Sequence, residues 1–223
     1  MRLRPGRVFS IGRDSPPTPG CTTSQAICRT SGAAALVVTI FSFAAGTDIS
    51  AESYGCHKLL MVAAGGVCAY AADGRAWELA EGEALVTLIG VPVGMRSSGG
   101  CVYTELTLAK EAQMNEALAA GEVVTLADLL PIQDGKIVSM DVARNDGMKL
   151  ALMSFAAGTG LDEHAAPGEA LVFALEGEAT IGYEGAEHAI HAGENFKFDK
   201  GGAHYVRADR PFKMALLLLL EEA

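Results

Sequence analysis

Short apolar runs alternate with glycine-bearing turns along most of this chain. Runs such as VVTIFSF (37–43), LVFALEGEATIGY (171–183) and MALLLLL (214–220) are punctuated by turns such as DG, EG and AGE. The turns recur roughly every 8–12 residues, a spacing typical of an all-β sandwich or barrel. The pattern therefore predicts an all-β fold.

One segment has a helical pattern instead. AKEAQMNEALAA (Ala109–Ala120) is rich in Ala, Glu and Leu, and Gly121 follows it as a stop signal. We expect a helix here, and a short helical turn over Thr125–Pro131. The first 30 residues are richer in arginine, proline, serine and threonine, so we expect an arm that is partly loop or disordered over Asp14–Gly20.

The hexapeptide SFAAGT occurs twice, at Ser42–Thr47 and at Ser154–Thr159. The similarity extends upstream, from GRVFSI (6–11) to GEVVTL (121–126), and downstream, from DGRAWELAEGE (73–83) to EGAEHAIHAGE (184–194). This predicts a duplicated domain. The expected division is an arm over 1–30, a first domain over 31–109, a helical linker over 110–135 and a second domain over 136–223.

Composition narrows the class of protein. The formal net charge of −10 argues against nucleic-acid binding, because such proteins gather Lys and Arg on one face. The five cysteines are an odd number without a CxxC pair, which favours reduced, cytosolic thiols. No apolar run approaches the ~20 residues of a membrane span. We expect a cytoplasmic protein without nucleic-acid or membrane partners.

Two stretches of the second copy resemble the sequence motifs of the cupins, GTGLDEHAAPGEALVFALEG (158–177) and GENFKFDKGGAHYVRA (193–208). The cupin pattern is matched by Gly158, His164, Glu169 and Gly177 in the first motif, and by Gly193, Gly201 and His204 in the second. The chain departs from the pattern at Ala166, Asp199 and Ala208, which replace a histidine, a proline and an asparagine. The resemblance implies a bicupin: two tandem antiparallel jelly-roll β-barrels joined by the helical linker.

The resemblance also implies a metal site, since cupins commonly hold one divalent metal through three histidines and a glutamate. Carried over by position, the ligands are His164, Glu169 and His204, with Ala166 unable to contribute. Two imidazoles and a carboxylate suit a transition metal such as Fe, Mn, Zn or Ni, and three protein ligands leave open positions. The alternative is that His164 and Glu169 form a hydrogen-bonded pair that lines an apolar pocket.

The first copy lacks this ligand set. Its counterparts of His164, Ala166, Glu169 and His204 are Glu52, Tyr54, His57 and Val93, which offer too few ligands for a tight site. We therefore expect no metal there. In the second copy, His188 is a candidate lining residue or substitute ligand, because its counterpart Trp77 is apolar; His191 is expected to face solvent.

The resemblance favours a C-terminal barrel that binds a divalent metal and a small molecule, and three accounts of its role stay open. The first is a metal-dependent enzyme, such as a dioxygenase or isomerase, acting on a small molecule in that barrel. The alternative is a non-catalytic small-ligand-binding cupin, with or without metal. In the third, the degenerate first barrel is an oligomerisation platform, and the resemblance favours a homodimer. The sequence does not decide whether there is turnover.

Overall fold

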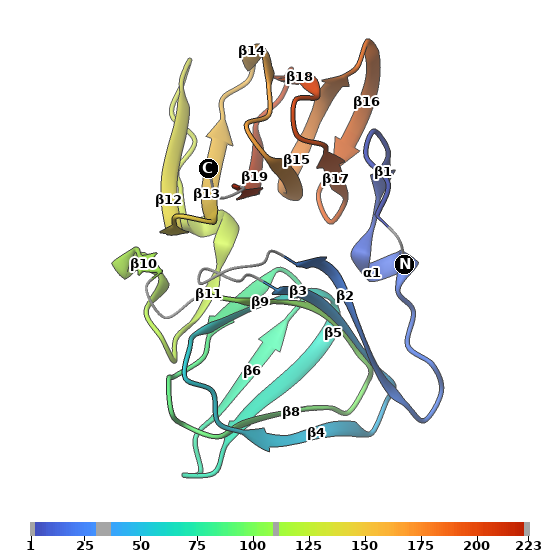
Figure 1. The fold of residues 1–223 in the computed structure, drawn as a ribbon, viewed down its shortest axis with the longest axis vertical. Coiled ribbons are helices and arrows are strands. Elements are labelled where there is room, and N and C mark those ends of the chain that lie inside the picture. Colours follow the sequence, from blue (N-terminus) through green and yellow to red (C-terminus); the bar gives the residue numbers. More distant parts are fainter. Residues whose placement is uncertain (1–2, 30–36, 109–111, 221–223) are drawn as a thin grey trace. The chain divides into compact units, whose positions relative to one another are not determined.

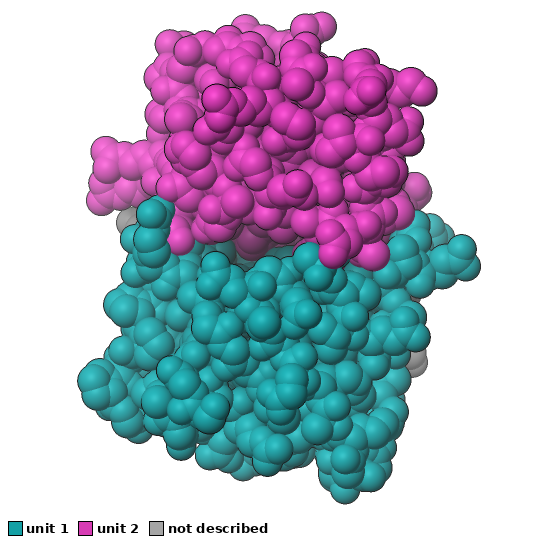
Figure 2. Space-filling view, turned by 180° about the vertical axis from the view of Figure 1, so that it is seen from behind, with its two compact units in different colours: residues 1, 11–125 teal, residues 2–10, 126–223 magenta. Residues whose placement is uncertain are grey.

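The computed structural model describes residues 3–29, 37–108 and 112–220. Two compact units emerge from the contacts (Figure 2): unit 1 comprises Ile11–Thr125, and unit 2 comprises Arg2–Ser10 with Leu126–Ala223. Each unit is built almost entirely of curled antiparallel sheets (Figure 1). The predicted all-β, jelly-roll character is therefore confirmed.

In unit 1 the strands pair in the order β11-β7-β5-β9-β3-β2, and a second run pairs β4-β8-β5-β6. The bounds are β2 (Thr22–Arg29), β3 (Val37–Phe43), β4 (Thr47–Glu52), β5 (Lys58–Ala71), β6 (Ala76–Ala80), β7 (Glu83–Val86), β8 (Val93–Ser97), β9 (Cys101–Thr107) and β11 (Val123–Thr125). A short helix, α1 (Ile11–Asp14), precedes them.

Unit 2 repeats this plan strand for strand, in the orders β1-β17-β15-β19-β13-β12 and β14-β18-β15-β16. The bounds are β1 (Val8–Phe9), β12 (Ile137–Asn145), β13 (Met148–Phe155), β14 (Thr159–Ala165), β15 (Glu169–Tyr183), β16 (Ala186–His191), β17 (Asn195–Phe198), β18 (Ala203–Ala208) and β19 (Phe212–Leu219). The duplicated sequence thus folds into two similar barrels.

The strands β5 and β15 each belong to both runs of their unit, and a glycine makes this change of partner feasible. Gly65 and Gly177 have φ of 74° and 77°, in the left-handed region that favours glycine. A Cβ on Gly65 would lie 2.3 Å from the Gly100 carbonyl oxygen, and one on Gly177 would lie 2.1 Å from that of Pro211. Both strands also have a register shift just before the glycine, as expected where a strand turns a barrel corner.

The repeated hexapeptide performs the same structural task twice. The Ser42 and Ser154 hydroxyls each donate to a backbone carbonyl of a preceding segment at 2.8 Å. The Thr47 and Thr159 hydroxyls each donate at 2.8 Å to the carbonyl three residues earlier, across a glycine with positive φ. SFAAGT therefore encodes an anchored turn and carries no chemistry of its own.

The linker prediction is wrong where it can be examined. Residues 109–111 lie outside the described part, but the remainder forms β10 (Gln113–Met114) and a 3-10 turn, η1 (Glu116–Leu118). The Asn115 side chain accepts from the Ala117 N–H at 2.9 Å, so it ends the extended stretch and starts the turn. The helix expected over Ala109–Ala120 is short enough that its formation depends on tertiary packing rather than on the helix propensity of its residues. The expected turn over Thr125–Pro131 is present as η2 (Leu126–Leu129).

The N-terminal arm is more ordered than expected. Its GRVFSI stretch contains β1, which pairs with β17 of unit 2. The matching GEVVTL stretch contains β11, which pairs with β7 of unit 1. The Ser/Thr-rich part forms β2, and the proline-rich loop between α1 and β2 is irregular. Among the described residues, no helix has the length and apolarity to span a membrane.

Candidate functional site

Two of the three predicted ligands meet at one end of unit 2. His164 on β14 and His204 on β18 are cross-strand partners, and their ring centroids lie 4.3 Å apart. Each ring places Nδ1 within 3.0 Å of a backbone carbonyl two residues earlier. A carbonyl only accepts, so Nδ1 carries the proton and Nε2 keeps its lone pair. Burial lowers the pKa of His204, which favours the neutral ring.

Glu169 does not join them. On β15, Ala170 and Val172 belong to the barrel core, so the intervening side chains point to the opposite face. Glu169 lies on that face, half exposed, and its carboxylate pairs with Lys197 at 3.1 Å. Across the part of the chain that the structure describes, no three His, Cys, Asp or Glu side chains are close enough together to hold a metal. The predicted donor set is therefore not assembled.

The interior of unit 2 is occupied by aromatic side chains. Phe196 and Phe198 are fully buried, with ring centroids 5.1 Å apart, and His204 stacks on Phe198 at 4.1 Å. His188 packs against Phe196 at 5.2 Å, which places it on the inner face as expected. His191 is exposed and pairs with Glu194, also as expected. Aromatic rings therefore fill the part of this barrel beside His204 and His188.

Unit 1 has instead a cavity of about 250 Å³ inside its barrel. Its floor is buried and its rim, at Ser50, Glu52 and Tyr54, is exposed. The lining residues are Phe41, Ile49, Ser50, Glu52, Tyr54, Lys58, Leu60, Thr87, Leu88, Val91, Val93, Met95, Tyr103 and Glu105. A mostly apolar hollow with a few convergent polar groups is the usual character of a small-molecule site.

A buried ion pair lies within this cavity. The Lys58 ammonium contacts a Glu105 carboxylate oxygen at 2.7 Å, and the two side chains are only 12% and 11% exposed. Lys58 also lies over the Tyr54 ring, 3.4 Å from its centroid. Tyr54 donates to the Glu52 carboxylate; partial burial first, and this hydrogen bond second, raise the pKa of Tyr54 to about 12. The phenol therefore stays protonated.

Tyr103 forms part of the buried wall. It is 1% exposed and stacks on Phe41, with centroids 5.0 Å apart and planes inclined by 12°. Burial raises the pKa of Tyr103 well above its usual value, and the nearby Glu105 carboxylate adds to the effect. Its hydroxyl has no hydrogen-bond partner among the described residues. It is not one of their fully buried unsatisfied polar atoms, so it keeps accessible surface on the cavity side, where water can bond to it.

The sequence interpretation missed Lys58, Glu105, Thr87 and Tyr103, and it dismissed the barrel that holds them. Of the counterparts named for this barrel, Glu52, Tyr54 and Val93 line the cavity. His57 does not; its Nδ1 bonds to the Thr87 carbonyl at 2.7 Å. The available signal was the charged Glu105 in the middle of the apolar strand CVYTELT.

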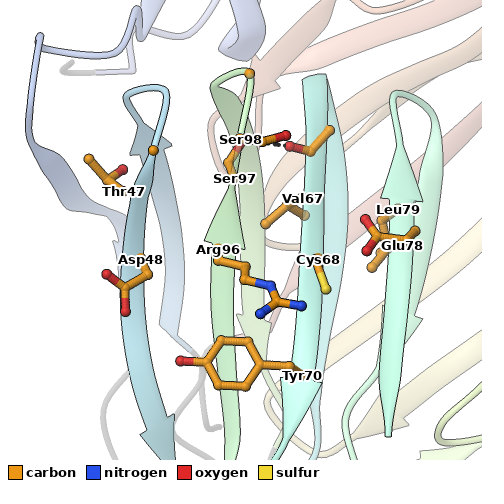
Figure 3. Close-up of a pocket in the computed structure, with 13 residues that line it drawn as sticks. Thr47, Asp48, Val67, Cys68, Tyr70, Glu78, Leu79, Arg96, Ser97 and Ser98 are labelled. Carbon is orange, nitrogen blue, oxygen red and sulfur yellow. Dashed lines mark hydrogen bonds between the residues drawn. The ribbon is translucent and has the colours of Figure 1, made fainter.

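A larger hollow of about 860 Å³ lies on the outside of unit 1 (Figure 3). Asp48, Arg96, Cys68 and Glu78 form a row across β4, β8, β5 and β6, and the Arg96 guanidinium stacks over Tyr70 at 5.3 Å. Their neighbours along each strand, such as Val67 and Leu79, belong to the core. Asp48, Glu78 and Arg96 of this row are exposed on the outer face, whereas Lys58 and Glu105 of the inner cavity are almost fully buried.

Comparison with known proteins agrees with the fold. The family model described as cupin domain matches residues 151–220. A cupin 2 conserved barrel domain protein from Leptotrichia buccalis superposes with a TM-score of 0.84 at 22% identity, covering 97% of this chain and 98% of that one. No curated protein matches the sequence.

Two further solved structures share the fold at lower similarity. A putative glyoxylate induced protein from Pseudomonas aeruginosa gives a TM-score of 0.58 at 14% identity, covering 91% of this chain and 81% of that one. A salicylate 1,2-dioxygenase from Pseudaminobacter salicylatoxidans gives 0.58 at 11% identity, covering 82% and 70%. At these identities the likeness concerns the fold alone.

Proposed function

We propose that the chain binds a small molecule inside the barrel of unit 1, without a metal; the match of residues 151–220 to the cupin domain model and the shared barrel fold support a cupin, a fold that commonly encloses small ligands. The observation that carries the proposal is the ion pair between Lys58 and Glu105 within an otherwise apolar cavity. Burying two charges is expensive, and a well-packed apolar pair is often as stable. A binding role accounts for keeping them.

The equivalent positions of unit 2 support this assignment. Leu60 of unit 1 lies opposite Leu85 and Glu105, as Val172 of unit 2 lies opposite Phe196 and Leu216. Two residues earlier on β5 and β15, Lys58 is the counterpart of Ala170. The strand pairings then make Thr87, which lies opposite Lys58, the counterpart of Phe198, which lies opposite Ala170. Unit 2 thus has three apolar groups where unit 1 has three polar ones, and Phe198 occupies the space that Thr87 leaves open.

The test fills the cavity with the side chain that unit 2 uses. Four one-ring probes, toluene, phenol, benzoate and benzylamine, are titrated into the wild type, Thr87→Phe and the control Thr23→Phe, which alters an exposed residue of β2. We expect at least one probe to bind wild type with one site per chain and to shift amide signals of unit 1. Thr87→Phe should remove this binding and Thr23→Phe should keep it.

Two results would contradict the proposal. One is that none of the four probes binds the wild type. The other is that Thr87→Phe, shown by its circular dichroism spectrum to be folded, binds them as the wild type does.

A metal-dependent function in unit 2 is the second candidate, and the contact between His164 and His204 is the observation that favours it. Two imidazoles fall short of the three protein ligands typical of catalytic sites, and Glu169 lies on the other face of its strand. Metal analysis of wild type and His204→Ala, purified without chelator, tests this candidate. About one metal per chain in wild type and none in the variant would favour it over the metal-free proposal.

A further inference from the structure

The cavity of unit 1 also indicates which ligand it takes, an inference that rests on the proposed function. The first clue is the Tyr103 hydroxyl, which lies on the cavity side of a buried side chain and has no protein partner in the described part of the chain. A hydroxyl has one proton to donate and two lone pairs to share. A ligand that fills the cavity displaces water from this hydroxyl, and the lost hydrogen bond costs free energy unless a polar atom of the ligand replaces it.

The second clue is the Glu105 carboxylate. Its single hydrogen bond within the described residues is to Lys58, through one oxygen, so its remaining lone pairs are available to a donor. Glu105 and Tyr103 are two positions apart on β9 and therefore share the inward face. One ligand hydroxyl between them can donate to the carboxylate and accept from the phenol.

Charge selects against an anionic ligand. Lys58 is already neutralised by Glu105, and the second carboxylate, Glu52, stands at the rim. An anion would have to compete with Glu105 for Lys58 and enter past a negative group. A charged ligand would also lose its hydration in the buried floor, which is costly without an unengaged counter-ion. An uncharged ligand meets neither obstacle.

Size and shape limit the apolar part of the ligand. An engineered apolar cavity of about 150 Å³ accepts benzene, so about 250 Å³ admits one ring with small substituents. Phe41, Leu60 and Met95 supply flat and flexible apolar walls. The outer hollow beside Arg96 offers no comparable buried surface.

We propose that the ligand is an uncharged, hydroxyl-bearing molecule with a single compact ring, whose hydroxyl bonds to Glu105 and Tyr103. The ring lies among Phe41, Leu60 and Met95. The Lys58 ammonium holds the Glu105 carboxylate in place, and this carboxylate accepts a hydrogen bond from the ligand hydroxyl. Phenol is the simplest probe of this class, and toluene is its matched analogue without the hydroxyl.

The experiment compares probe affinities by calorimetry at pH 7, where phenol is uncharged. We expect phenol to bind wild type about 3- to 10-fold more tightly than toluene, the advantage of one buried hydrogen bond, and benzoate to bind weakest. Tyr103→Phe removes only the unpartnered hydroxyl and should fold normally. It should reduce phenol affinity to near that of toluene and leave toluene affinity unchanged. Glu105→Gln, which keeps an acceptor oxygen, should weaken phenol binding less than Glu105→Leu.

Failure of this inference differs from failure of the proposed function. Equal binding of phenol and toluene, tightest binding of benzoate, or an unchanged phenol preference in Tyr103→Phe would overturn the ligand class while unit 1 remained the binding barrel. Loss of all probe binding in the wild type would overturn the binding site itself.

Discussion

The two barrels share a strand order and differ in what fills them. Unit 1 places Lys58, Thr87 and Glu105 at inward positions where unit 2 has Ala170, Phe198 and Leu216. The residues that match the cupin domain model lie in unit 2, yet the polar cavity lies in unit 1. The match to a family model and the physical signal of a site, buried charge beside open space, are therefore found in different copies.

The largest expected effect comes from breaking the ion pair. Lys58→Ala leaves the Glu105 carboxylate buried without its partner, and we expect unit 1 to lose about 3 kcal/mol of unfolding free energy. Adding Glu105→Leu gives both positions the residues of unit 2 and should restore most of the loss. Urea unfolding followed by the fluorescence of Trp77, the chain's one tryptophan and part of β6, reports on unit 1.

The control for this prediction is an exposed pair of the same unit. Arg75→Ala breaks the contact with Asp73, in which both side chains are about half exposed, and also removes the guanidinium that lies over the Trp77 ring, 5.7 Å from its centroid. Its unfolding is therefore followed by circular dichroism, and the midpoint should not change. If the double variant Lys58→Ala with Glu105→Leu were as unstable as Lys58→Ala alone, the interior of unit 1 would not tolerate the apolar residues that unit 2 has at these positions.

Substitution of the corner glycine should destabilise both units by the same amount, and by less than the loss of the ion pair destabilises unit 1. Gly65→Ala and Gly177→Ala each force a Cβ against a carbonyl oxygen at positive φ, and each should destabilise its unit by about 2 kcal/mol or more. The matched controls Gly74→Ala and Gly185→Ala also have positive φ but open space around the new methyl group, so they should cost about 1 kcal/mol. Amide exchange in each unit measures both. Unequal losses of stability at Gly65 and Gly177 would contradict the claim that the two glycines play the same structural role in their units.

The smallest effect concerns pH and unit 2. Burial lowers the pKa of His204 in the folded protein below its ordinary value near 6.5. Below pH 6.5 the unfolded chain therefore binds a proton at His204 more readily than the folded protein does. The contribution of His204 to the unfolding free energy is complete above pH 6.5 and is lost as the pH falls towards the folded pKa. Replacing His204 by the residue of unit 1, in His204→Val, should therefore flatten the fall in stability between pH 7 and pH 5. An unchanged slope in amide-exchange measurements would show that His204 does not titrate in this way.

Much of the fold followed from the sequence, because alternation and glycine turns are local signals. The all-β class and the duplication were predictable in this way. The helix over Ala109–Ala120 was not, since Ala, Glu and Leu favour a helix only where packing supports one. Asn115 and the buried Leu118 instead stabilise a short 3-10 turn.

The site was harder to predict for a physical reason. Along EALVFALEG, both faces of β15 are apolar, so alternation does not reveal that Glu169 points away from Ala170 and the core. The cross-strand contact of His164 with His204 follows from the paired motifs. The face of the sheet to which the Glu169 side chain points depends instead on the register of β15. In unit 1, Lys58 and Glu105 are far apart in sequence, and only the pairing of β5 with β9 brings them together.

The most direct test of the account is a titration of phenol into the wild type and Thr87→Phe, followed residue by residue through amide chemical shifts. The account predicts saturable shifts around Leu60, Tyr103 and Glu105 in the wild type and none in Thr87→Phe. Shifts around His164 and His204 instead, or equal binding by a folded Thr87→Phe variant, would contradict the claim that the binding barrel is unit 1.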